Sequence, residues 1–391
     1  MENRGLVKLI VLSLLCLAIH VMTAQGQTLY SKDAKITVSA HTVITVKGSV
    51  ENLGTLTNNG HLKVGGPWVN AGTYHAGTGQ ITFNSTSATT PQIIHHNGQS
   101  FNTVTVAGGT KKIILSDMVI GKEIRFVDGV IEASGISQII FDQGVNISGA
   151  SDSSHIHARL YQRGDGPKLF PVGNGLIYLP VELTDVGDAS ALIGIQGFEY
   201  ENLTLAKSPS LQSISDIRYW HIDVVSGSLT DSQIILPLRD ESWISDPGRI
   251  VVVQSPSPTQ NFVSIGGWYV EGEVVSGRVA SKGEVSMPFV ALATAAVEKK
   301  LIVYNAVSPN GDDLNDYLRI ENIENYPANR FSLYNRWGDK VFETANYDNG
   351  ERAFKGRGNI HGDSELVSGT YFYVLDLPEG ESLRGFVAVK N

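Results

Sequence analysis

Glycine recurs at every sixth position in the first part of the chain, and an apolar residue follows each glycine two places later. The glycines are Gly48, Gly54, Gly60, Gly66 and Gly72, and the apolar residues are Val50, Leu56, Leu62, Trp68 and Tyr74. Because six is an even number, an extended chain presents all of these apolar residues on one side. The period therefore predicts stacked short strands in a β-solenoid. A meander of hairpins is the alternative.

The same repeat places asparagine at a further fixed position, where stacked amides or left-handed turns are natural. Asn52, Asn58 and Asn70 occupy it. Strand-like runs such as "QITFN", "KKIILS" and "QIIFD" continue after Tyr74 with irregular spacing. We assign residues 27–155 to a glycine-rich, solenoid-like β region, with Leu56, Leu62 and Trp68 pointing into one core.

The six-residue period ends near residue 155, where aromatic residues and proline become more frequent. Longer alternating runs follow, including "RYWHIDVV", "SQIILPL" and "RIVVVQS". These runs predict an antiparallel β-sandwich over residues 156–297. The segment "ATAAVEKK" then indicates a linker, and a last domain is expected at 301–391. The whole chain is predicted to be all-β.

The N-terminal residues have the pattern of a signal peptide. Arg4 and Lys8 precede an apolar run, and Ala24-Gln25-Gly26 is a small-x-small cleavage pattern. Residues 1–26 are therefore expected to be removed on export, together with the only cysteine, Cys16. The formal net charge of −9 and the lack of a basic patch argue against nucleic acid as a partner.

An acidic loop near the C-terminal end carries the strongest candidate chemistry. Asp312, Asp313, Asn315 and Asp316, with Asn310 before them, offer closely spaced oxygen ligands of the kind that Ca²⁺ prefers. The spacing differs from that of an EF-hand. The alternative is that Asp and Asn stand here because they favour turns. No other cofactor is expected.

Two other groups of polar residues allow more than one interpretation. His95, His96, His155 and His157 lack a third ligand at readable spacing, so they are interpreted as surface histidines and not as a zinc site. Asp117, Lys122, Arg125 and Asp128 suit either the groove of a sugar-cleaving solenoid enzyme or ordinary rim positions. The motifs of serine hydrolases, zinc proteases and nucleotide-binding loops do not occur.

Four ordered motifs in the last ninety or so residues resemble one family. They are "AVSPNGDDLNDYLRI", "FSLYNRWGDKVFET", "VSGTYFYVLDL" and "GFVAVKN". The segment resembles the gliding-motility-associated C-terminal domain of Bacteroidetes, the type B sorting domain of the type IX secretion system. The matching positions are Pro309, Asn310, Gly311, Asp312, Asn315, Asp316, Asn335, Arg336, Trp337, Gly338, Gly369, Thr370 and Tyr371. Asp313 departs from the usual glycine, and Phe354-Lys355-Gly356 from the usual Trp-Asp-Gly.

This resemblance implies a small immunoglobulin-like β-sandwich at 301–391 that is read by the type IX translocon and its outer-membrane partner proteins. We expect Trp337 and Tyr371 to supply much of its core, and Gly338 and Gly369 to permit turns. The whole chain is then expected to be a surface or extracellular protein with an adhesive or structural role. It would be non-enzymatic and would bind a glycan or protein. The alternative is a secreted polysaccharide lyase or glycoside hydrolase.

Overall fold

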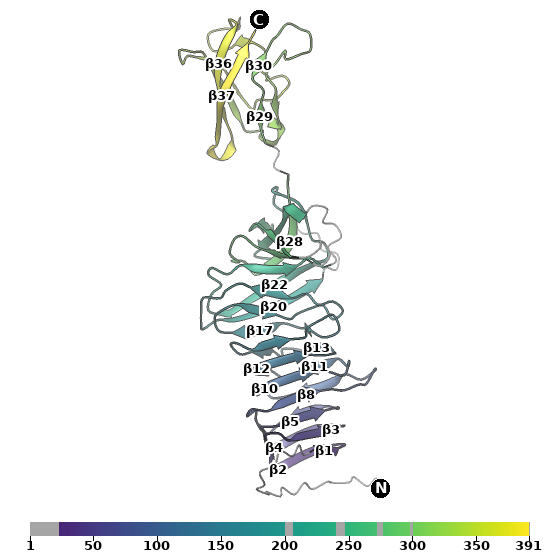
Figure 1. Cartoon of the computed structure of the whole chain (residues 1–391). Coiled ribbons are helices and arrows are strands. Elements are labelled where there is room, and N and C mark those ends of the chain that lie inside the picture. Colours follow the sequence, from purple (N-terminus) through teal and green to yellow (C-terminus); the bar gives the residue numbers. More distant parts are fainter. Residues whose placement is uncertain (1–22, 200–205, 240–246, 272–276, 298–299, 391) are drawn as a thin grey trace. The chain divides into compact units, whose positions relative to one another are not determined.

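The computed structural model describes residues 23–199, 206–239, 247–271, 277–297 and 300–390 (Figure 1). The chain forms two compact units, Met1–Ala296 and Val297–Asn391. Nearly all regular structure is β-strand, which confirms the predicted all-β class. Most of the predicted signal peptide lies outside the described residues. No helix in the described ranges is both long and apolar enough to cross a membrane.

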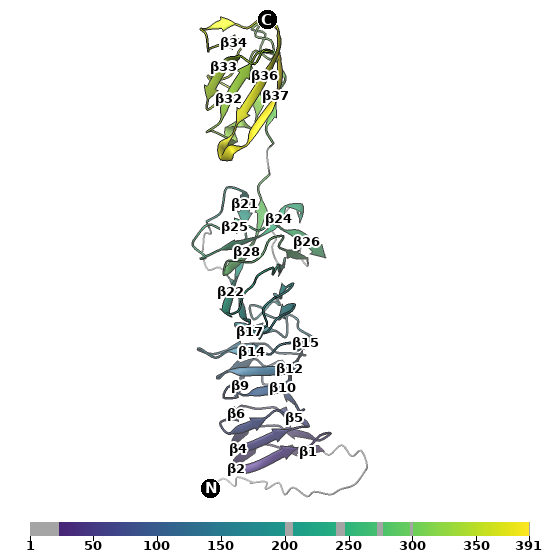
Figure 2. The same cartoon turned by 90° about the vertical axis from the view of Figure 1, so that its left-hand side faces the viewer.

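The first unit begins as a β-solenoid, as predicted, whose strands pair in parallel from one coil to the next (Figure 2). Two sheets contain these strands. One includes β1 (Thr23–Gly26), β3 (Val43–Val46), β5 (His61–Val64), β8 (Gln80–Phe83), β10 (Ser100–Val106), β12 (Met118–Phe126), β14 (Ile139–Phe141) and β15 (Asn146–Ser148). The other comprises β2 (Leu29–Val38), β4 (Val50–Asn58), β6 (Trp68–Asn70), β7 (Thr73–His75), β9 (Gln92–His95), β11 (Lys112–Ile114), β13 (Ile131–Ala133) and β16 (Ile156–His157).

Three six-residue repeats make one coil of this solenoid. Val50 pairs with Trp68 on one side of the coil, and Leu56 pairs with Tyr74 on the next. Leu62, on the third side, pairs with Ile81. Leu56, Leu62 and Trp68 are at most 1% exposed and belong to one hydrophobic cluster, which confirms that they share a core.

The periodic glycines allow neighbouring coils to approach closely. A Cβ atom on Gly66 would lie 2.6 Å from the carbonyl carbon of Gly48, and one on Gly72 would lie 2.2 Å from the carbonyl oxygen of Gly54. Neither glycine has a positive φ. Glycine is therefore required at these positions by the close approach of neighbouring backbones, and not by a left-handed turn.

The periodic asparagines satisfy backbone groups inside the coil corners. Asn52 Nδ2 donates to Asn70 Oδ1 at 2.7 Å across adjacent coils, so the predicted stacking of amides occurs here. Asn52 Oδ1 accepts the Gly54 N–H at 3.2 Å, and Asn58 Oδ1 accepts the Gly60 N–H at 3.2 Å. Each asparagine is buried. The repeat thus pairs an interior amide with the glycine two residues later.

The solenoid changes into an antiparallel region without a break in its larger sheet. Strand β17 (Leu160–Arg163) pairs in parallel with β14 and antiparallel with β20. The sheet continues through β20 (Leu192–Glu199), β22 (Arg218–Ser226), β28 (Phe289–Ala295), β24 (Ile250–Ser255) and β25 (Val263–Ser264), with β21 (Leu211–Ile214) on β28. The predicted change near residue 155 coincides with this switch in strand direction, inside one compact unit.

A second antiparallel sheet lies in this region. It runs in the order β18 (Lys168–Phe170), β19 (Val181–Leu183), β23 (Ile234–Pro237), β27 (Arg278–Ala280) and β26 (Trp268–Glu271), and the short 3₁₀ helix η1 (Pro247–Arg249) precedes β24. Trp220 from the larger sheet and Leu236 from the smaller sheet are both fully buried in the same hydrophobic cluster as the solenoid interior. The solenoid and the antiparallel region therefore share one continuous core.

The second unit is built on one five-stranded sheet and two small ribbons. The sheet has the order β30 (Ala306–Val307), β37 (Ser382–Val389), β36 (Gly369–Asp376), β32 (Arg330–Tyr334) and β33 (Lys340–Ala345). The ribbons are β29 (Ile302–Val303) with β31 (Ile320–Glu321), and β34 (Arg357–Gly358) with β35 (Ser364–Glu365); 3₁₀ turns are η2 (Ile323–Asn325) and η3 (Pro378–Gly380). This unit has its own hydrophobic core, which includes Phe331, Leu333 and Leu375.

Candidate functional site

The acidic loop between β30 and β31 is held by its own side chains. The Asp316 carboxylate accepts the backbone N–H of Gly311 at 2.7 Å and that of Asp313 at 2.9 Å. Asp312 accepts the Leu314 N–H at 2.9 Å and the Asn310 side-chain amide at 2.8 Å. The Asn310 amide and the Leu314 N–H hold the pKa of Asp312 below its usual range. The carboxylates therefore act first as caps for local backbone groups.

Two non-glycine residues of this loop have left-handed backbone conformations. Asp313 has a φ of 64° and Asn315 a φ of 58°. Asp and Asn are the non-glycine residues that enter this region most readily. Asp313 stands where the related family usually has glycine, and its left-handed conformation is one that aspartate tolerates. The replacement of glycine by aspartate therefore leaves the loop intact.

The calcium interpretation of Asp312, Asp313, Asn315 and Asp316 stays a prediction. Within the described part of the chain, no three His, Cys, Asp or Glu side chains are grouped so that they could hold a metal ion. The hydrogen bonds of Asp312 and Asp316 to backbone N–H groups account for the loop geometry by turn formation alone. Titration with Ca²⁺ is the measurement that distinguishes the two interpretations.

A second motif forms the hairpin between β32 and β33. Asn335 Oδ1 accepts the backbone N–H groups of Trp337 at 2.9 Å and Asp339 at 3.0 Å, and Gly338 has a φ of 89°. The expectation that Trp337 fills the core is wrong, because its side chain is 75% exposed at the hairpin tip. The Arg336 guanidinium lies 4.8 Å from the centre of the indole ring. A tight Asn-based turn leaves no core position for this tryptophan.

The third motif opens β36. Tyr371 is 8% exposed and belongs to the core, as expected, and its hydroxyl donates to the Val367 carbonyl at 2.9 Å. Thr370 is exposed beside it. Gly369 does not form the expected turn, since it pairs with Val389 in the ladder and lacks a positive φ. The motif therefore contributes one core aromatic and a strand start.

Phe354 occupies the position where the family usually has tryptophan. Its side chain is fully buried, and its ring lies 5.1 Å from that of Phe342. Its carbonyl accepts the Leu318 N–H at 2.8 Å, which ties the end of the acidic loop to the core. The substitution keeps an aromatic core residue at this position.

The sequence of the second unit matches a known family model over residues 301–389, described as the CHU_C type IX secretion signal domain. The C-terminal unit is a type IX secretion signal domain. The signal domain implies export of the chain across the outer membrane to the cell surface or the extracellular space, and interaction with the type IX secretion machinery. No curated protein and no solved structure matches the chain.

Outside the signal domain, two of the four predicted surface histidines lie in the core. His96 is fully buried, with its ring stacked 3.6 Å from that of Phe101. His155 is fully buried, with ring nitrogens 3.0 Å from the Ser151 carbonyl and 3.1 Å from the Gly175 N–H. His157, by contrast, lies 3.1 Å from the Glu132 carboxylate near the surface. Ring packing therefore explains the burial of His96, and backbone hydrogen bonds explain that of His155.

The polar residues proposed for an enzyme groove each have a separate structural environment. Arg125 forms an ion pair with Glu123 at 2.7 Å. Asp117 accepts the Gln138 N–H at 2.8 Å in the turn before β14. Lys122 lies within β12, and Asp128 lies in the turn that follows this strand. Arg125 and Asp117 therefore have structural contacts at a strand surface and at a turn.

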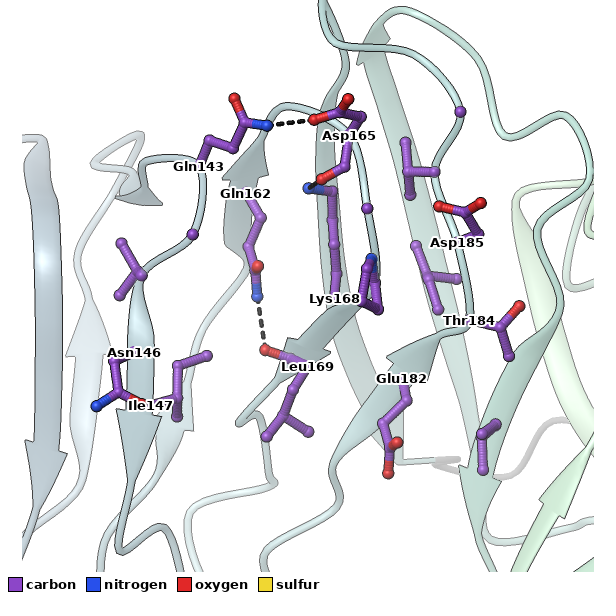
Figure 3. A pocket seen from close by; sticks show the side chains of 18 residues that line it. Gln143, Asn146, Ile147, Gln162, Asp165, Lys168, Leu169, Glu182, Thr184 and Asp185 are labelled. Carbon is purple, nitrogen blue, oxygen red and sulfur yellow. Dashed lines mark hydrogen bonds between the residues drawn. The ribbon is translucent and has the colours of Figure 1, made fainter.

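A pocket of about 970 Å³ lies where the solenoid meets the antiparallel region (Figure 3). The turn before β15, the turn between β17 and β18, and the end of β19 line it. Several polar side chains in it are already paired. Gln143 donates to Asp165, Gln162 Nε2 donates to the Leu169 carbonyl at 2.6 Å, and Glu182 forms an ion pair with Arg278. The sequence did not indicate this pocket, because its walls come from segments that are far apart in the chain.

Proposed function

We propose that this exported chain is a non-enzymatic surface protein with an adhesive or structural role, and that its first unit binds a glycan through the pocket beside β15 and β19. The observation that supports this is the pairing inside the pocket. Of the three carboxylates that line the pocket, Glu182 pairs with Arg278 and Asp165 accepts the Gln143 amide, so two of them serve the wall and Asp185 is left for a ligand. A catalytic acid or base needs instead a carboxyl group directed at the reacting bond.

The chemistry of the remaining lining suits a neutral polyhydroxylated ligand. Asn146, Thr184 and Asp185 offer amide, hydroxyl and carboxylate groups, and Ile147 and Leu169 add aliphatic surface (Figure 3). Such mixed walls orient sugar hydroxyl groups by hydrogen bonds while the aliphatic carbons contact the sugar ring. The described solenoid interior is packed with mainly apolar side chains, so it offers rigid support.

The test incubates the full mature chain with a panel of bacterial and algal polysaccharides and measures both retention and released products. Binding without new reducing ends or unsaturated sugars is the expected result. Asn146→Ala with Asp185→Ala is expected to weaken binding, whereas Asp216→Asn, which alters an exposed aspartate outside the pocket, serves as the matched control. Release of short sugars would instead establish the lyase or hydrolase alternative.

A further inference from the structure

The five-stranded sheet of the signal domain has one covered face and one open face. Phe331, Leu333, Leu375 and Val387 point into the core and are fully buried. Residues that alternate with them along the same strands point the other way. Phe372 and Phe386 lie on this open face and are 50% and 53% exposed. The open face of the sheet therefore carries large aromatic side chains in solvent.

These aromatic residues are in register across neighbouring strands. Phe386 in β37 pairs with Phe372 in β36, and Phe372 pairs with Tyr334 in β32. Tyr334 in turn pairs with Lys340 in β33, whose ammonium lies 5.9 Å from the centre of the tyrosine ring. We call Phe386, Phe372 and Tyr334 the aromatic row. Directly opposed side chains on one sheet face are neighbours, so the aromatic row crosses three adjacent strands on one face.

Trp337 is a further exposed aromatic residue, in the hairpin at the end of the sheet. The hairpin that carries it connects Tyr334 directly to Lys340, and Arg336 covers one side of its indole ring. Neither fold stability nor turn formation requires an aromatic residue here, because the Asn335 amide and Gly338 make the turn. Contiguous exposed aromatic surface on a soluble domain indicates an interaction site, and aromatic residues and arginine are the residue types that dominate such sites.

Basic and acidic side chains both lie around the aromatic row. Arg384 lies two residues from Phe386 on the same face and is exposed, while Arg336 and Lys340 flank the hairpin. Glu343 lies 2.7 Å from Lys340 and 3.5 Å from Arg330 in ion pairs. Asp376 is opposite Arg330 in the sheet, and Asp339 lies in the hairpin. Because these charges are mixed, the exposed aromatic rings are the distinctive part of the surface, and they complement a partner that offers apolar side chains.

We propose that the aromatic row is the surface of the signal domain that docks onto the type IX secretion machinery, and that the complementary site there is apolar. The proposal rests on the assignment of the signal domain and is independent of the glycan-binding role proposed for the first unit. The secretion machinery is the partner class that the signal domain itself implies. The acidic loop is the less suitable contact, because Asp312 and Asp316 already bond to their own backbone.

The test uses the full chain, expressed in a bacterium with a working type IX system, and measures the ratio of surface to periplasmic protein. Phe372→Ser with Phe386→Ser is expected to lower this ratio by about tenfold or more, as for loss of a hot spot. Phe372→Tyr, which keeps an aromatic ring at this position, should leave most of the export intact. Val367→Ser is the matched control, because Val367 is 80% exposed but lies before β36, outside the aromatic row.

Two further measurements keep the result interpretable. Thermal unfolding of the purified double variant should match that of the parent, which separates loss of docking from loss of folding. Light scattering of the parent and the variant reports whether the aromatic row joins two copies of the chain. Normal export of a folded double variant would overturn the proposal. The proposal would also be overturned if the double serine variant failed to fold while the variant with Phe372→Tyr and Phe386→Tyr folded but was exported no better than the double serine variant.

Discussion

Trp68 and His96 are hydrogen-bonded inside the solenoid core, where the indole Nε1–H donates to His96 Nδ1 at 3.1 Å. This bond requires that Nδ1 be unprotonated, so the neutral ring carries its hydrogen on Nε2. Burial lowers the pKa of His96 to about 3. A core histidine of this kind must stay neutral for the solenoid to remain folded.

The first prediction is that acid destabilises the solenoid through His96. In the unfolded chain this histidine takes up a proton near its ordinary pKa, 6.5, whereas in the folded chain it does so only near 3. The free energy of unfolding therefore falls as the pH drops through this window, by a few kcal/mol. Replacing His96 with Gln keeps a hydrogen-bond acceptor and should remove most of this dependence. Denaturant titrations at neutral pH and at about pH 4 compare the two proteins; equal acid sensitivity would exclude His96 as the cause.

A second prediction concerns the shared core of the coils. Leu62→Asp buries a carboxylate among apolar side chains and should destabilise the first unit by several kcal/mol. Leu53→Asp is its control, because Leu53 lies in the same coil but is 38% exposed. Thermal unfolding should distinguish the two variants clearly. Equal melting of Leu62→Asp and the parent would contradict the three-sided coil.

The third prediction is that buried Lys112 makes the folded chain more stable as the pH rises. Most paired basic groups have the opposite effect on stability. Its side chain is fully buried, and Nζ donates to the Ala107 and Thr110 carbonyls at 2.5 Å each. Burial lowers its pKa to about 8, although the nearby Asp128 carboxylate acts in the other direction. Between about 8 and the ordinary value, 10.5, the unfolded chain holds the extra proton, so stability rises with pH. Lys112→Met should lose this rise relative to the parent in unfolding measurements, whereas Lys111→Met, at an exposed neighbour, should retain it.

The fourth prediction concerns Trp337 and Tyr371, both of which were expected in the core of the signal domain. Trp337→Ala should leave thermal unfolding of the signal domain nearly unchanged, within about 0.5 kcal/mol, because the side chain is exposed. Tyr371→Ala should destabilise the domain by about 3–5 kcal/mol, since it empties a core position. Circular dichroism melts of both variants are sufficient. A large loss of stability for Trp337→Ala would place this residue in a contact that the hairpin geometry does not show.

A fifth prediction follows from the division of the chain into two compact units. Deletion of residues 297–391 should leave the first unit folded, because its core includes no residue of the signal domain. The shortened protein should then remain in the periplasm, since it lacks the domain that implies export. Cell fractionation with surface proteolysis measures this. Normal surface levels of the shortened chain would contradict the role of the signal domain.

The sequence predicted the solenoid well because its period acts locally. Alternation of side chains and the spacing of glycine and asparagine are properties of short segments, and they gave the inward direction of Leu56, Leu62 and Trp68. The number of sides in a coil depends instead on contacts across eighteen residues, such as that between Asn52 and Asn70. Later coils differ in length, since Trp68 pairs with the more distant Ile94, and the period fades accordingly.

The candidate sites were less predictable, because residue type does not determine exposure. Trp337 is apolar enough for a core, yet the Asn335 turn places it in solvent. His96 is polar enough for a surface, yet the rings of Trp68 and Phe101 enclose it. The motifs of the signal domain were readable as a family pattern, but the aromatic row depends on strand register, which no single motif contains.

The pairing of Val50 with Trp68 and of Leu56 with Tyr74 limits how the solenoid region can change in length during evolution. Three hexapeptides form one coil here, with Gly66 against Gly48 and Gly72 against Gly54. Insertion of a single hexapeptide would place each side of the coil against a different side below it and separate the glycines from their close contacts. Duplication of three hexapeptides together would preserve every contact and add one complete coil. Related proteins that lengthen this regular part of the solenoid should therefore do so in whole coils, and not in single hexapeptides.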